Sequence, residues 1–89
     1  MPVISTFYGV VIMMFFFDNR RHSRPHIHAE YAEYEALIAI DNGDVLDGGL
    51  PIRQMRLVQA WVEIHYEELK SDWQLAVQGK QIAKIDPLR

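Results

Sequence analysis

The stretch Arg24-Pro25-His26-Ile27-His28-Ala29-Glu30-Tyr31 decides the fold, together with Ala32-Glu33-Tyr34-Glu35-Ala36-Leu37-Ile38-Ala39-Ile40, which follows it directly. Apolar residues alternate with polar or charged ones through much of it, a pattern typical of β-strands with one buried face. We therefore predict a β-hairpin with strands at 26–31 and 34–40 and a two-residue turn at Ala32-Glu33. Because such turns favour Gly or Asn, a longer loop remains the alternative.

A tight turn divides the side chains of this hairpin between two faces. The face that suits the core carries Ile27, Ala29, Tyr31, Tyr34, Ala36, Ile38 and Ile40. The opposite face carries His26, His28, Glu30, Glu35 and Leu37. The first strand therefore presents two histidines on one side of the sheet.

Further strands are expected on both sides of the hairpin. Residues 1–6 are β-prone and suit an edge strand, and Val10–Phe17 is a strand by its β-branched and aromatic content. The turn signal Asp41-Asn42-Gly43-Asp44 precedes a brief strand at Val45-Leu46, and a short last strand is expected at Ile82–Ile85.

A long helix is expected between the last two of these strands. Pro51 occupies the favoured first position, and apolar residues recur at spacings of three and four up to Gly79, which can end the helix. Ser71-Asp72 could instead cap a second helix. The predicted fold is α+β, one small domain with an antiparallel sheet of three to five strands and one long C-terminal helix, residues 51–78, packed on one face.

The strand Val10–Phe17 is apolar on both faces, although a sheet covered on one side needs only one. The face that includes Met13, Phe15 and Phe17 must therefore be covered by another part of the chain or by another molecule. These three residues are our candidates for a subunit or partner interface.

Composition narrows the classes of protein. The chain has 89 residues, 49% of them hydrophobic and 24% charged, which predicts a single globular domain. It has no cysteine, which excludes disulfides and thiolate chemistry and fits a reducing compartment. The apolar run Val10–Phe17 is too short to span a membrane and lacks the features of a signal peptide. We expect a cytoplasmic protein without a membrane anchor.

Histidines suggest the place of a chemical site, because three of the four lie between positions 22 and 28. His26 and His28 project from one strand face and could hold one metal ion, with Glu30, His22 or His65 as a further ligand. The alternative is a polar strand face whose rings bond the backbone or nearby acids. His65 falls on the apolar stripe of the helix, where a histidine is usually a core residue with a hydrogen-bond partner.

Charge is distributed unevenly along the chain, whose overall net charge is −3. Residues 1–28 carry a net charge of +2, and Arg20, Arg21 and Arg24 there could contact nucleic-acid phosphates. Residues 29–50 carry a net charge of −6 without any Lys or Arg, which opposes nucleic-acid binding nearby. The acidic residues could instead pair with a basic partner or with the basic loop of a second copy.

No nucleophile motif, glycine-rich phosphate loop or aromatic–basic RNA motif is present. Asp41 to Asp47 does not have the spacing of a calcium-binding loop. The leading hypothesis is a non-enzymatic binding module that acts with a small protein partner or as a homo-oligomer, without a cofactor. The alternatives are a histidine- or metal-dependent enzyme such as a nuclease-like toxin, and a regulator that contacts nucleic acid.

Motifs along nearly the whole chain resemble one family. They are Met1-Pro2-Val3-Ile4-Ser5, Pro25-His26-Ile27-His28-Ala29-Glu30-Tyr31, Leu50-Pro51, Trp61, His65, Glu68-Leu69, Trp73, Lys84-Ile85 and Pro87-Leu88. Together they resemble domain-of-unknown-function family 4160, small bacterial proteins without an assigned activity. The resemblance directs attention to His26, His28 and His65. Members are commonly encoded beside another small protein, which implies a two-protein module of the toxin–antitoxin kind.

Two departures from the family pattern concern candidate residues. The loop before Pro25 is rich in Arg where the family has Asn and Pro, so a role for Arg20 or Arg21 would be particular to this chain. Met13 stands where the family usually has a polar or basic residue. The second face of its strand is therefore more apolar, which favours self-association.

Overall fold

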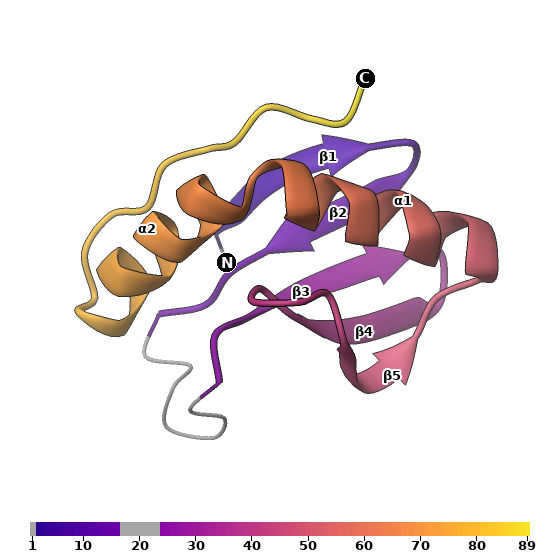
Figure 1. Cartoon of the computed structure of the whole chain (residues 1–89), viewed down its shortest axis with the longest axis horizontal. Coiled ribbons are helices and arrows are strands. Elements are labelled where there is room, and N and C mark those ends of the chain that lie inside the picture. The colour runs from indigo at the N-terminus through magenta and orange to yellow at the C-terminus, as the bar shows by residue number, and fades with distance from the viewer. Residues whose placement is uncertain (1, 17–23) are drawn as a thin grey trace.

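The structure is a computed structural model that describes residues 2–16 and 24–89, and these residues form a five-stranded antiparallel sheet and two helices. The strands are β1 (Val3–Phe7), β2 (Val10–Met13), β3 (His26–Tyr31), β4 (Tyr34–Ala39) and β5 (Val45–Gly49). They lie side by side in the order of the sequence (Figure 1). The predicted α+β class and antiparallel sheet are confirmed.

The hairpin of β3 and β4 has the predicted two-residue turn. Tyr31 pairs with Tyr34, and Ala32 takes a positive φ of 51°, as the first residue of such a turn requires. The core residues Ile27 and Ile38 pair directly and are fully buried. The apolar alternation therefore fixes the register, because a slip of one residue would turn these side chains to the other face.

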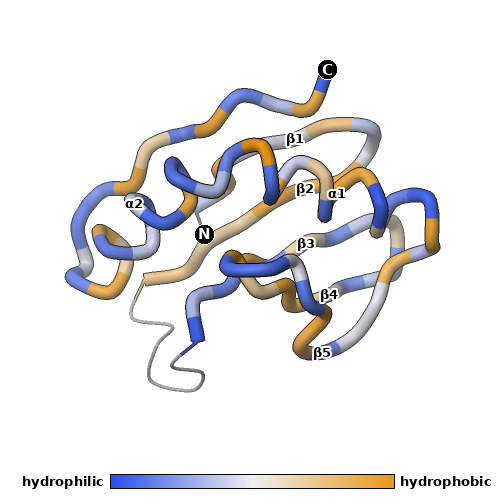
Figure 2. The backbone as a smooth tube through the Cα atoms, viewed as in Figure 1, coloured by the Kyte–Doolittle hydropathy of each residue, from blue (hydrophilic) through white to orange (hydrophobic). Residues whose placement is uncertain are grey.

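The core lies between the sheet and the two helices, α1 (Ile52–Ile64) and α2 (Tyr66–Val77). Both helices cover the same face of the sheet (Figure 1), and hydrophobic and hydrophilic residues alternate along them (Figure 2). Their buried apolar residues are Met55, Val58, Trp61 and Val62 of α1 and Leu69, Trp73 and Ala76 of α2. Within the described residues, no helix is long and apolar enough to cross a membrane.

The prediction of one long helix is wrong in detail, since the helix breaks at His65 and not at Ser71-Asp72. His65 has φ −106° and ψ 27°, its N–H donates to the Trp61 carbonyl at 3.0 Å, and no side chain caps the junction. The apolar spacing continues in phase from Val62 to Leu69, so periodicity alone does not reveal the break.

The C-terminal residues 80–89 form no strand, contrary to the prediction for Ile82–Ile85. One backbone hydrogen bond, from Ile85 N–H to the Ile4 carbonyl at 2.8 Å, ties the segment to β1. Two backbone groups that a further strand could have used for sheet hydrogen bonds are bonded to helix side chains instead. Ala83 N–H donates to Asp72 Oδ1 at 3.0 Å, and the Asp86 carbonyl accepts from Trp61 Nε1 at 2.8 Å. The segment thus runs from α2 along β1 (Figure 1).

The strands around the hairpin also differ in length from the prediction. β2 ends at Met13, before the expected Phe17, which lies outside the described residues together with Arg20 and Arg21. β5 extends to Gly49, beyond the expected Val45-Leu46. Gly48 there has a φ of 68°, and a Cβ at this position would collide with the Glu35 carbonyl oxygen. Only glycine allows this close approach of β5 to β4.

Candidate functional site: the open face of the sheet

The sheet face turned away from the helices is the candidate site, and we call it the open face. Residues paired across antiparallel strands project to the same face, so the register defines its side chains as two rows. The first row is Val3, Met13, His28, Leu37 and Asp47, and the second is Thr6, Val11, Glu30, Glu35 and Gly49. The two rows lie two residues apart on β3, about 7 Å along the strand.

Apolar side chains occupy the middle of the open face. Val11 and Leu37 are half-buried although no helix covers them, and Phe15 meets the ring of His28 edge-on with ring centroids 4.4 Å apart. Met13 is only 2% exposed, so this predicted interface residue offers a partner little surface. The apolar surface available for contact therefore comes from Val11, Phe15 and Leu37, together with Val3 of β1, which is 39% exposed.

Carboxylates adjoin these apolar residues. Glu30 and Glu35 are directly paired across β3 and β4, and Asp47 is paired with Leu37 at the edge of the sheet. The two rows contain no Lys or Arg. Like charges placed directly opposite each other on one face of a sheet destabilise it. The Glu30–Glu35 pair is thus an unfavourable arrangement that the fold itself does not require.

His26 begins β3 and is fully buried, unlike the exposed polar residue that alternation predicts. Its ring lies against Trp73 of α2, with centroids 5.0 Å apart, so the helix covers this end of the strand. Its Nδ1 lies 2.9 Å from the Arg24 carbonyl oxygen. A carbonyl can only accept, so Nδ1 carries the hydrogen of this bond.

His28 lies on the open face, as predicted, between Met13 and Leu37. Its Nδ1 is 3.8 Å from Glu35 Oε1, and its ring centroid is 5.4 Å from that of His26. These two imidazoles are the residues that could contribute to a metal site. In residues 2–16 and 24–89, however, no three His, Asp or Glu side chains come together in a group that could hold a metal ion.

His65 lies apart from the other two histidines, at the break between α1 and α2. Its Nδ1–H donates to Glu68 Oε1 at 2.7 Å, and its ring centroid is 5.4 Å from that of Trp61. Its side chain is only 14% exposed, which agrees with its predicted place on the apolar stripe. The structure therefore does not bring the predicted candidates His26, His28, Glu30 and His65 into one site.

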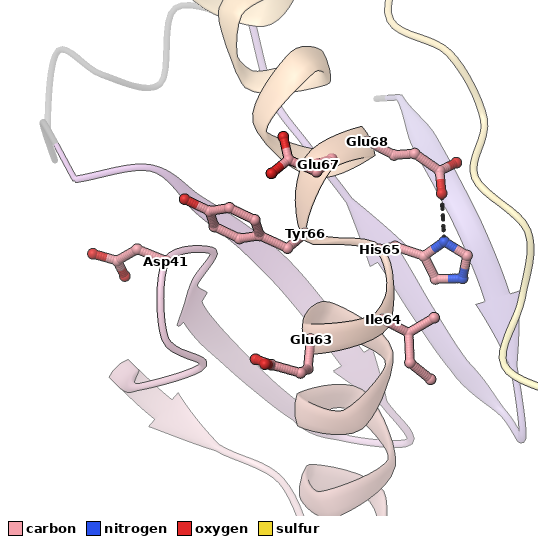
Figure 3. Close-up of a pocket in the computed structure, with 7 residues that line it drawn as sticks. All are labelled: Asp41, Glu63, Ile64, His65, Tyr66, Glu67 and Glu68. Carbon is pink, nitrogen blue, oxygen red and sulfur yellow. Dashed lines mark hydrogen bonds and ion pairs between the residues drawn. The ribbon is translucent and has the colours of Figure 1, made fainter.

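A hollow of about 430 Å³ lies beside this helix break. It is lined by Asp41, Glu63, Ile64, His65, Tyr66, Glu67 and Glu68. In Figure 3, Tyr66 and Glu63 point toward Asp41, whereas His65 and Glu68 point to the opposite side of the helix. The His65 ring therefore lies on the opposite side of the helix from the carboxylates of Glu63 and Asp41. A catalytic centre would require these groups to converge on one point.

Arg24 is the one candidate for phosphate contact that lies within the described residues. Its guanidinium lies 3.1 Å from Asp41 Oδ1 and 3.5 Å from Asp44 Oδ2, and it donates to Asn42 at 3.0 Å. The hydrogen bond to Asp41 raises the pKa of Arg24. Arg24 would have to give up these carboxylates to bind a phosphate.

Sequence reasoning placed Glu35 and Leu37 on the same face as His28 but did not single them out as site residues. It also missed Val11 and Asp47. Their common signal is register, because each is the cross-strand neighbour of a residue already on this face. A sequence shows alternation within one strand, whereas the register between separate strands needs the structure.

Comparison with models of protein families matches residues 9–74 to a domain of unknown function, DUF4160. The matched region runs from the β1–β2 turn to Gln74 of α2 and includes most of the open face. No curated protein and no solved structure matches the chain.

Proposed function

The chain belongs to the DUF4160 family, and from this premise we propose that it is a binding module whose open face contacts a partner protein. The observation that carries the proposal is the pair of half-buried aliphatic side chains, Val11 and Leu37, on a sheet face that neither helix covers. A partner that removes them from water gains hydrophobic free energy, about 25 cal/mol for each Å² buried.

Binding accounts for the contacts of the histidines better than catalysis does. The Nδ1–H of His26 bonds a backbone carbonyl, and its ring packs on Trp73. His28 packs against Phe15 near the carboxylate of Glu35. These contacts position an aromatic ring within the open face, where aromatic residues contribute strongly to protein interfaces.

The biological setting that fits this proposal is one half of a two-protein module, in the toxin–antitoxin arrangement that the family resemblance implies. The lack of cysteine fits a reducing compartment, and we expect the binding to take place in the cytoplasm. A separate small protein is the leading partner, and a second copy of this chain is the alternative.

The test is to co-express the chain with the product of the neighbouring gene and to measure the complex by light scattering and calorimetry. Leu37→Ser removes an aliphatic side chain from the open face, and Ile64→Ser is the matched control on the helical side, where Ile64 is 65% exposed. We expect Leu37→Ser to weaken binding at least about tenfold and Ile64→Ser to change it less than about twofold.

Two outcomes would overturn the proposal. One is a complex whose affinity is the same for wild type and Leu37→Ser. The other is a chain that stays monomeric at high concentration and forms no complex with the neighbouring product. Thermal unfolding of both variants checks that the Leu37→Ser protein is folded when its binding is measured.

A further inference from the structure

We infer that the partner surface is cationic and carries lysine or arginine side chains next to apolar ones. This inference rests on the proposed function and specifies the chemistry of the partner. It begins from the Glu30–Glu35 pair, in which two carboxylates are directly opposed on neighbouring strands. Such a pair destabilises a sheet, and oppositely charged or neutral residues could occupy the same positions without changing the core.

Nothing within the described chain neutralises these carboxylates with a permanent positive charge. Among residues 2–16 and 24–89, the ion pairs of Lys and Arg involve Arg24 with Asp41 and Asp44, at the turn after β4. Among the described residues, one potential counter-charge is His28, whose Nδ1 lies 3.8 Å from Glu35 Oε1 and which is charged only when protonated. A lysine or arginine from a partner would convert the repulsion between Glu30 and Glu35 into two attractions.

The apolar and acidic groups are arranged in a way that limits the partner. Leu37 lies in the first row and Glu35 in the second, about 7 Å apart along β4. On a partner surface that matches, a basic side chain lies about 7 Å from an apolar one. Side chains two residues apart on an extended segment have this spacing. The net charge of −6 in residues 29–50 would also attract such a segment from a distance.

Charge also argues against a second copy of this chain as the occupant. The two rows of the open face contain Glu30, Glu35 and Asp47 and no basic residue. In a two-fold symmetric dimer the same patch is used on both copies. Two open faces packed on each other would therefore bring these carboxylates together without compensation, at a cost that a cationic partner avoids.

The experiment compares two double variants that change the net charge equally. Glu30→Gln with Glu35→Gln alters the open face, and Glu63→Gln with Glu67→Gln alters exposed positions on the helices. The probe is a short peptide of alternating lysine and valine, and its counterpart alternates glutamate and valine. Binding is followed by amide chemical shifts and by titration at low and moderate salt.

We expect the lysine peptide to shift amides of β2, β3 and β4, and to bind at least about tenfold more weakly to the open-face variant. The helix variant should lose less than about twofold. The open-face variant should also melt about 1 to 5 °C higher than wild type, because the repulsion is gone. Weaker binding together with higher stability is a signature that a purely structural role would not produce.

Three results with the peptides would overturn the inference. They are equal losses in both double variants, equal binding of the glutamate peptide, and no binding of the lysine peptide. Self-association that disappears in the open-face variant would assign the face to a second copy and would also overturn it. If the native partner is lost with Leu37→Ser but kept by the open-face variant, the proposed function stands and only the cationic partner is rejected.

Discussion

Two adjacent residues of β4 show how the two faces of the sheet differ, because their side chains point to opposite faces. Ile38 points into the core and is fully buried, packed with residues of both helices. Leu37, its neighbour, lies half-buried on the open face between His28 and Asp47. The covered face thus contains side chains that the fold needs, whereas the open face keeps apolar and acidic groups that folding alone does not explain.

The difference in burial determines which residues are constrained by folding and which can be explained by function. A core residue contributes several kcal/mol to folding, so its identity is constrained by packing. Apart from the buried Met13, residues of the open face contribute less to folding, and one pair, Glu30 and Glu35, opposes it. A carboxylate pair that costs stability fits the proposed role of the open face in binding a cationic partner.

The largest expected effect comes from truncating the two neighbours on β4. Ile38→Ala leaves a cavity in the core and should cost about 2 to 5 kcal/mol of unfolding free energy. Leu37→Ala removes only partly buried surface and should cost about 1 kcal/mol or less. Urea denaturation of both variants measures the difference. Equal losses would mean that the open face is as important for folding as the core, and the contrast between the faces would fail.

The next effect concerns the glycines that place β5, and with it Asp47, on the edge of the open face. Gly48→Ala should cost about 2 to 3 kcal/mol, because the φ of 68° disfavours alanine and the new Cβ meets the Glu35 carbonyl. Gly49→Ala is the matched control, since a Cβ added there would meet no atom within 4 Å. It should change stability by less than about 1 kcal/mol. A tolerated Gly48→Ala would show that β5 pairs loosely with β4.

A smaller effect is expected on the covered side, at Asp72 of α2. Asp72 is 2% exposed, its Oδ1 accepts from Ala83 N–H at 3.0 Å, and its Oδ2 has no hydrogen-bond partner among the described residues. Asp72→Ala leaves the Ala83 N–H without its acceptor and should cost about 1 to 3 kcal/mol. Asp72→Asn keeps an acceptor oxygen and should cost less, as measured by urea denaturation at neutral pH.

The pH dependence of Asp72 follows from the direction of its pKa shift. Burial raises the pKa of Asp72 and nearby Glu68 adds to this, although the hydrogen bond from Ala83 lowers it. The stability that protonated Asp72 contributes is complete below its unfolded pKa and is lost as the pH rises through the folded pKa. Asp72→Asn should therefore gain on wild type across that pH window. A constant difference between the two proteins at all pH values would contradict the raised pKa.

Much of the covered face could be predicted from the sequence. The alternation in 26–40 identified the hairpin and most of its buried residues, because each strand carries its own period. Tyr34, assigned to the core face, is instead 44% exposed beside the turn. The spacing of apolar residues also located the helical region. It could not reveal the break at His65, since Val62 and Leu69 stay on one stripe across it.

The open face was harder to predict, for a reason that its residues make clear. Val11 joins Glu30 and Glu35 only through the register between separate strands, which no single stretch of sequence encodes. The burial of His26 likewise depends on Trp73, 47 residues away in the chain, whose ring packs against it. Long-range contacts of this kind decide which of two similar histidines is fully buried.

The smallest expected effect tests His65, the histidine of the covered side. Glu68→Ala removes the acceptor of its 2.7 Å hydrogen bond and should cost about 0.5 kcal/mol, as for other pairs three residues apart on a helix. The Glu68 side chain is 56% exposed, so water can replace it at the imidazole. Thermal unfolding compares this variant with Glu67→Ala, an exposed neighbour on the same helical turn.

A loss above about 2 kcal/mol for Glu68→Ala alone would mean that the break between α1 and α2 depends on this pair. His65 would then be a structural hinge residue whose replacement disturbs both helices. A small loss instead shows that packing on Trp61, with ring centroids 5.4 Å apart, holds the imidazole in place. In that case His65 can be replaced without altering the open face, and its contribution to partner binding can be measured separately from that of His28.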